Sequence, residues 1–175
     1  AGMVRKVGGF TFQELNLTME DIRDTGAVGA DLSYDFVTRP GYHHALATAN
    51  TEFLRLALNT ALETGVEPVQ LVHGMQNHDE LTYELVHWAT THRDTLYPFR
   101  HGEQTGAEIA ETVRAELTEK LTVDADYNLV FTQNGIACTS ASLIAASQGK
   151  ARLEDITEED IPSIRDAHLL LAKYN

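Results

Sequence analysis

The chain has 175 residues, of which 43% are hydrophobic and 22% are charged, the composition of an ordinary globular protein with a core of its own. Acidic residues outnumber basic ones by 26 to 13, and the formal net charge is −13. That charge argues against nucleic acid and anionic membranes as partners, because both would be repelled. No apolar run approaches the roughly 18 residues of a membrane-spanning helix. The single cysteine, Cys138, excludes an internal disulfide, so we expect a cytoplasmic protein.

In the first half of the sequence, short apolar runs alternate with longer amphipathic ones. Alternation of large apolar and polar residues predicts three strands, at Phe10–Asn16, Ala30–Val37 and Val69–Met75. Helices are predicted between them, at Thr18–Gly26 and Tyr42–Thr64. Gly65 follows as the expected C-cap, and Arg39–Gly41 should end the second strand. Strands that alternate with helices indicate parallel βαβ units.

The second half predicts mainly helices. They are expected at Glu80–His92, Glu103–Lys120 and Ile136–Ser147, and from Thr157 to the end of the chain. In the last of these, Leu169–Leu171 should lie on the buried side, whereas Asn128–Thr132 is too short to assign. The final helix has no stop signal, which suggests that the chain is a fragment of a longer domain.

Polar residues that could carry chemistry lie at the ends of two predicted strands. Gln76–Glu80 follows the third strand, where the loops of parallel barrels hold their catalytic residues. There His78 and Asp79 offer a donor and a charged acceptor to sugar hydroxyls, although an acid-rich helix start would look the same. Glu14 lies in the first strand, where a solvated edge residue is the alternative. Two carboxylates that converge on one pocket are the arrangement for glycosidic bond cleavage.

These segments resemble a known family. Phe12–Glu14, Asp31–Phe36 and Gln76–Glu80 look like the fifth, sixth and seventh strand regions of the α-amylase superfamily, glycoside hydrolase family 13. The run Asn77–Thr82, Asn-His-Asp-Glu-Leu-Thr, is also similar to that of trehalose synthases and related maltose-acting enzymes.

The resemblance implies a role for each matching residue. Glu14 would be the general acid/base, and Asp79 would bind sugar hydroxyls and stabilise the oxocarbenium-like transition state. His78 would donate a hydrogen bond to the glucosyl ring, with Asn77 and Gln76 supporting the loop. Retaining chemistry also needs a nucleophilic Asp about 5 Å from the acid. The Arg-x-Asp segment that supplies it in the family is missing here, so the chain alone should be inactive.

The implied fold is α/β, a partial (β/α)8 barrel with strands five to seven, followed by a helical segment. Residues 1–92 would belong to the catalytic barrel, and residues 93–175 would be a helical insertion or continuation of the same domain. The parent enzyme would be a retaining hydrolase or glucosyl-transferring isomerase for maltose- or trehalose-type α-glucosides, without a cofactor. Open strand edges would favour self-association or association with the missing part of the barrel.

Two alternatives to an enzyme fragment remain open on the sequence alone. The chain could be a non-catalytic acidic interaction module, or a pseudo-enzyme that only binds sugar. The aromatic residues Tyr83, Trp88 and Tyr97–Phe99 could form a platform for a sugar ring or pack in the core. A metal site is not expected, because His87 and His92 are five residues apart, off one another's helical face, and no HExxH spacing occurs.

Overall fold

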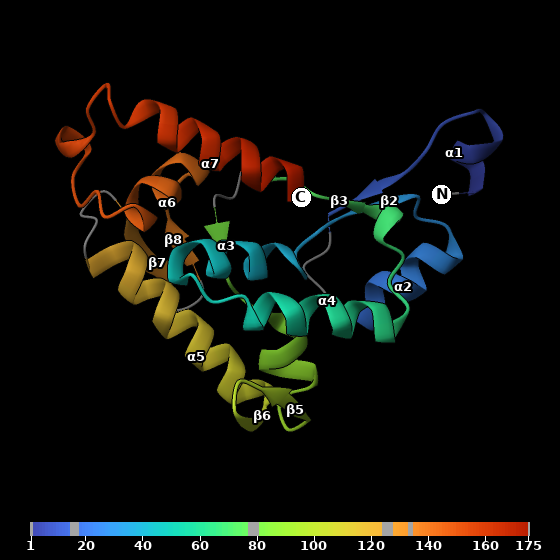
Figure 1. Ribbon diagram of the computed structural model, residues 1–175. Coiled ribbons are helices and arrows are strands. Elements are labelled where there is room, and N and C mark those ends of the chain that lie inside the picture. The colour runs from blue at the N-terminus through green and yellow to red at the C-terminus, as the bar shows by residue number, and fades with distance from the viewer. Residues whose placement is uncertain (1, 15–17, 77–80, 124–127, 133–134, 175) are drawn as a thin grey trace.

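The computed structural model describes the chain except for residues 1, 15–17, 77–80, 124–127, 133–134 and 175 (Figure 1). The helices are α1 (Gly2–Lys6), α2 (Met19–Val28), α3 (Arg39–Thr48), α4 (Glu52–Thr64), α5 (Gly106–Thr118), α6 (Ser140–Ser147) and α7 (Ile161–Tyr174). Short 3-10 turns are η1 (Pro68–Gln70) and η4 (Leu153–Asp155), and π-turns are η2 (His87–Thr91) and η3 (Glu119–Val123). The strands are β1 (Phe12–Gln13), β2 (Leu32–Tyr34), β3 (Leu71–Val72), β4 (Leu81–Thr82), β5 (Leu96–Phe99), β6 (Gly102–Thr105), β7 (Leu129–Thr132) and β8 (Gly135–Ala137). The protein is therefore mixed α/β with small sheets, and within the described ranges no helix has the length and apolar character to cross a membrane.

A parallel sheet of three strands forms the first half of the fold. The strands lie in chain order, β1-β2-β3, with Phe12 opposite Leu32 and Ser33 opposite Leu71. Helix α2 connects β1 to β2, and α3 with α4 connects β2 to β3; α2 and α4 lie below the strands in Figure 1. The predicted βαβ order of this half is confirmed. Consecutive parallel strands need such helical crossovers, because a tight turn cannot return the chain in the same direction.

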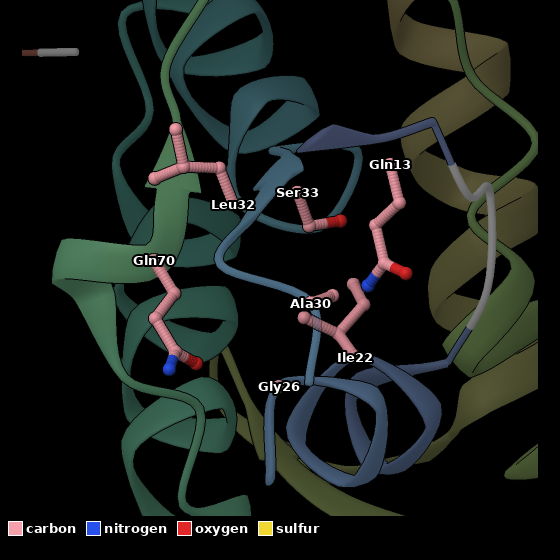
Figure 2. Close-up of a pocket in the computed structure, with 7 residues that line it drawn as sticks. All are labelled: Gln13, Ile22, Gly26, Ala30, Leu32, Ser33 and Gln70. Carbon is pink, nitrogen blue, oxygen red and sulfur yellow. The ribbon is translucent and has the colours of Figure 1, made fainter. Parts of the chain in front are cut away.

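The two faces of this sheet have different surroundings. Gln13 and Ser33, which share one register position, point toward α2 around a small gap next to Ile22 (Figure 2). On the opposite face, the rings of Phe12 and Tyr34 meet edge to face, with centroids 4.4 Å apart, and Phe12 is 44% exposed. Because side chains alternate along a strand, one face of the sheet packs on helices and the other is aromatic and partly exposed.

The helix predicted over Tyr42–Thr64 is in fact two helices. Helix α3 ends before Ala49, which takes a left-handed conformation with φ 56°, and α4 begins at Glu52. The side chain of Asn50 accepts a hydrogen bond from the Glu52 amide at 2.9 Å, so a polar residue competes with the continuing helix. Gly65 caps α4 as expected, with φ 84°.

The second strand ends earlier than expected, at Tyr34, and residues 39–41 begin α3 instead of ending the strand. Pro40 lies in the first turn of that helix, where its missing N–H group costs no intrahelical hydrogen bond.

In the second half, the helix predicted over Glu80–His92 is wrong, and those predicted over Glu103–Lys120 and Ile136–Ser147 are confirmed as α5 and α6 but begin later, at Gly106 and Ser140. The described part of Glu80–His92 contains strand β4 and π-turn η2, and Gly102–Thr105 pairs with β5 before α5 begins. The segment Asn128–Thr132, which was too short to assign from the sequence, contains β7. This strand pairs antiparallel with β8, which takes the place of the predicted start of the helix at Ile136. Short apolar runs do not distinguish a strand from a buried helix, and here long-range pairing decides.

The last helix begins later than predicted and buries less of its apolar run. Thr157 and Asp160 make the expected side-chain contact, with the Thr157 amide donating to the Asp160 carboxylate at 2.8 Å, but this contact lies in the turn before the helix, since α7 starts at Ile161. Leu169 and Leu170 are about half exposed, and Leu171 is the buried residue of the three. A run of three leucines spans too wide an arc of a helix to lie on one buried side.

The core lies between α3, α4, α5, α6 and η2. Its largest buried side chains are Trp88, Tyr83, Phe53 and Phe99. The rings of Phe53 and Trp88 meet with their centroids 5.1 Å apart. Tyr83, Trp88 and Phe99 are at most 2% exposed, so they are core residues and cannot form a sugar platform.

Candidate functional site

The site residues predicted from the sequence fall partly within the described chain. Glu14 directly follows β1 and is exposed. Gln76 lies in the loop after β3, and its side-chain oxygen accepts hydrogen bonds from the Ser140 amide at 2.9 Å and the Ser140 hydroxyl at 3.4 Å. Asn77, His78 and Asp79 lie outside the described residues. Glu14 and Gln76 thus follow parallel strands at the same, carboxyl-terminal edge of the sheet, and Gln76 ties the loop after β3 to the start of α6.

Glu14 comes two residues after Phe12, just past the end of β1, at the edge of the sheet where the aromatic side chains also lie. Tyr34 is the last residue of β2 and Phe36 comes just after it, and the centroids of their rings lie 5.9 Å apart. The guanidinium of Arg39, which is 2% exposed, lies 5.1 Å from the centre of the Phe36 ring. This edge therefore combines a carboxylate with a row of aromatic rings and a buried cation. Aromatic faces can stack on the apolar face of a sugar ring, and a carboxyl group can exchange a proton with a glycosidic oxygen.

An ion pair on the helix-covered face joins the ends of β2 and β3. Asp35, 2% exposed, accepts hydrogen bonds from the backbone amides of Val37 at 3.0 Å and Thr38 at 2.7 Å, and from the Thr38 hydroxyl. Its other contact is Nδ1 of His73, 3.0 Å away. Burial alone would raise the pKa of Asp35, but the hydrogen bonds from His73 and Thr38 outweigh it and lower that pKa. The same hydrogen bond raises the pKa of His73.

This pair was missed in the sequence, although a signal for it exists. Asp35 follows an apolar strand and precedes Thr38 by three residues, the spacing at which an Asp side chain caps the turn that follows it. His73 takes the equivalent place after the next strand. The pair joins the two strand ends, so it positions the end of β2, where Tyr34 and Phe36 lie, and the loop after β3 that carries Gln76.

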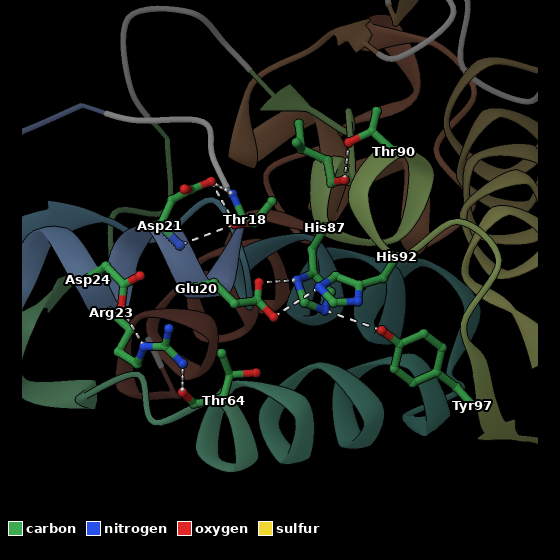
Figure 3. Close-up of polar contacts among 11 residues, drawn as sticks. Thr18, Glu20, Asp21, Arg23, Asp24, Thr64, His87, Thr90, His92 and Tyr97 are labelled. Atoms are coloured by element: carbon green, nitrogen blue, oxygen red, sulfur yellow. Dashed lines mark hydrogen bonds and ion pairs between the residues drawn. The ribbon is translucent and has the colours of Figure 1, made fainter.

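A second cluster of titratable side chains lies between α2 and η2 (Figure 3). Glu20 Oε1 is 2.9 Å from His92 Nε2, and Glu20 Oε2 is 3.5 Å from His87 Nδ1. The two imidazole rings lie with centroids 4.2 Å apart, and the Tyr97 hydroxyl is 3.4 Å from His87 Nε2. Burial, together with the neighbouring His92, lowers the pKa of His87 to about 4, so this imidazole is neutral at pH 7.

The expectation that His87 and His92 point apart is wrong. It assumed an α-helix, in which residues five apart are offset around the axis. Instead the His92 amide donates to the His87 carbonyl at 2.9 Å, the hydrogen bond of a π-turn, which brings residues five apart onto one side. Glu20, in the first turn of α2, completes a group of three possible metal-ligand residues.

Gly106 allows the first turn of α5 to pack closely against this π-turn. A Cβ atom at this position would lie 2.3 Å from the His92 carbonyl oxygen and 2.8 Å from the Trp88 carbonyl oxygen. We expect Gly106→Ala to lower the free energy of unfolding by about 2 kcal/mol through overpacking, measured by urea denaturation. Gly102→Ala is the matched control, because nothing lies within 4 Å of its Cβ position. Equal stability of the two variants would contradict the close packing, since alanine is otherwise the better helix former at Gly106.

The described residues thus offer two sites, the carboxyl-terminal edge of the parallel sheet and the Glu20–His87–His92 cluster. Neither needs the other for its geometry, because they use different side chains. Comparisons of the chain with protein-family models, with curated proteins and with solved structures found no match.

Proposed function

We propose that this chain is part of a retaining enzyme that acts on α-glucosidic bonds of the maltose or trehalose type, and that it supplies the acid/base side of the active site. The observation that carries the proposal is the order of the parallel sheet. Strands β1, β2 and β3 lie side by side in chain order, each pair joined through helices, and Glu14 directly follows β1. A (β/α)8 barrel is built from such units, and its active site lies at the carboxyl ends of its strands.

In this proposal, Glu14 protonates the glycosidic oxygen as the bond breaks and then removes a proton from the acceptor. The acceptor is water in a hydrolase and a sugar hydroxyl in an isomerase. Asp79 stabilises the oxocarbenium-like transition state and His78 donates a hydrogen bond to the glucosyl ring, roles for residues that lie outside the described part of the chain. Asn77 and Gln76 support the loop after β3, and the Gln76–Ser140 hydrogen bonds are consistent with that role.

The nucleophile must come from outside this chain, so the chain alone should not cleave the bond. A partial barrel also explains the aromatic face of the sheet, which a closed barrel would turn inward. Among the described strands, β1 and β3 each pair on one side, with β2. We therefore propose that the chain associates with the remaining barrel segment or with itself, and that the α-glucoside enters between the two parts. The cytoplasm remains the proposed location.

Sugar binding by the chain tests the proposal directly. We expect maltose to show saturation-transfer NMR signals with this chain, and the β-linked isomer cellobiose to show much weaker ones. Tyr34→Ala should reduce the maltose signal at least threefold, because it removes an aromatic ring from the sheet whose edge carries Glu14. Leu96→Ala is the control. Leu96 is an apolar residue of β5 that is 59% exposed, and its substitution should leave the signal unchanged. Equal signals from both sugars, or a signal indifferent to Tyr34, would contradict the proposed site.

A further inference from the structure

The cluster formed by Glu20, His87 and His92 has the dimensions of a metal site. One ligand atom from each residue can be chosen so that all lie within 4.8 Å of one another. In a tetrahedral site with metal–ligand bonds of about 2.0–2.1 Å, ligand atoms lie about 3.4 Å apart. Glu20 Oε2 and His87 Nδ1 are already 3.5 Å apart. The other oxygen of the same carboxylate, Glu20 Oε1, lies 2.9 Å from His92 Nε2, so a single carboxylate faces both imidazoles.

The contact between Glu20 and His87 leaves both atoms unsatisfied. His87 is 3% exposed, and in the described part of the chain neither its Nδ1 nor Glu20 Oε2 has a hydrogen-bond partner, although both atoms are buried. A buried polar atom without a partner lowers the stability of the fold. Because these two atoms face each other at 3.5 Å, one ligand placed between them could satisfy both. A cation between them accepts the lone pairs of both.

The surroundings orient the ligands. When the Nε2 proton of His87 is donated to the Tyr97 hydroxyl, 3.4 Å away, the Nδ1 lone pair is left facing Glu20 (Figure 3). A ligating histidine normally donates its second N–H group in this way, which fixes its tautomer and its ring. Glu20 is held by the first turn of α2, which Thr18 and Asp21 cap reciprocally. The π-turn that aligns His87 with His92 is a feature found often at functional sites.

We propose that Glu20, His87 and His92 bind one divalent transition-metal ion of the Zn²⁺ class, with a fourth position open to water. Two imidazole nitrogens with one carboxylate suit Zn²⁺, Co²⁺ or Ni²⁺, whereas Ca²⁺ and Mg²⁺ prefer oxygen ligands. Entry is open, since the side chains of Glu20 and His92 are 35% and 28% exposed. The ion would cross-link α2, in the parallel-sheet half, to η2, which follows β4, two segments that are distant in the sequence. The site is independent of the proposed sugar chemistry, because it uses none of the residues at the sheet edge.

Titration of the metal-free chain with Co²⁺ tests the site, because tetrahedral nitrogen and oxygen ligation gives intense visible absorption bands. We expect bands that saturate at one equivalent, competition by Zn²⁺, and a higher melting temperature with Zn²⁺, since metal affinity adds to folding stability. His92→Ala and Glu20→Gln should each weaken binding more than about 100-fold, because loss of an outer partner alone costs about 10- to 100-fold. Tyr97→Phe, which removes such an outer partner, should cost about 10-fold.

His101→Ala is the matched control, because His101 is an exposed histidine outside the cluster. It should bind Co²⁺ like the unmodified chain. Circular dichroism of each metal-free variant separates lost ligation from lost folding, and His92 and Glu20 are preferred to the buried His87 for this reason. Absence of tetrahedral bands, or bands that persist in both folded ligand variants, would overturn the proposal.

Discussion

Asp35→Asn should be among the most destabilising single substitutions in this chain, lowering the free energy of unfolding by about 3–5 kcal/mol. The carboxylate is 2% exposed and holds two backbone amides, the Thr38 hydroxyl and His73. Asparagine has nearly the same size and can keep the oxygen that holds the two amides, but it lacks the charge and the second acceptor oxygen, so His73 and the Thr38 hydroxyl lose their acceptor. Urea denaturation at pH 6 measures the change.

The pH dependence of this difference identifies its cause. The folded pKa of Asp35 lies below 3.8, so its contribution is present above pH 3.8 and is lost as the pH falls through the folded value. The folded pKa of His73 lies above 6.5, so its charge contribution is present below pH 6.5 and is lost as the pH rises through the folded value. The stability gap between the native chain and Asp35→Asn should therefore be widest between about pH 4 and 6.5.

Asp94→Asn is the control, because the Asp94 side chain is 91% exposed and 3.7 Å from its neighbour Arg93. Its effect should stay within about 0.5 kcal/mol, as for other surface substitutions. A gap for Asp35→Asn that does not change with pH would show that lost shape or lost backbone capping, and not the His73 ion pair, dominates.

The first half of the fold was predictable because its signals are local. Thr18 with Asp21 caps α2 by the expected reciprocal contacts, and Gly65 ends α4 in the expected left-handed conformation. Period-two alternation located β1, β2 and β3, and the βαβ order made them parallel. The place of Glu14, one residue past β1, follows from the same pattern.

The second half was not predictable in this way because partners distant in sequence decide its structure. Leu81–Thr82 becomes a strand by pairing with Gly135–Ile136, and no local pattern shows that pairing. The π-turn at His87–Thr91 is also invisible to a count based on 3.6 residues per turn. The Glu20–His87–His92 cluster was therefore missed, because it needs both that turn and the packing of α2 beside it.

The sharpest test of the proposed chemistry is Glu14→Gln in a protein that joins this chain to a nucleophile-bearing barrel segment. We expect kcat for maltose to fall by about 10²- to 10⁴-fold with little change in KM, because glutamine keeps the size of the side chain but cannot transfer a proton. With 4-nitrophenyl α-glucoside the loss in the bond-breaking step should be far smaller. That leaving group departs without protonation, so a general acid contributes little to its release.

The contrast between the two substrates separates acid catalysis from a structural effect of the substitution. Glu63→Gln, an exposed glutamate of α4, is the matched control and should leave both rates unchanged. An equal loss on both substrates would mean that Glu14 binds or positions the sugar without supplying the proton. Full activity on maltose would remove Glu14 from the mechanism, and maltose binding without any turnover would instead favour a sugar-binding module. A selective loss on maltose requires a proton donor at the end of β1, because only bond cleavage to a poor leaving group depends on protonation.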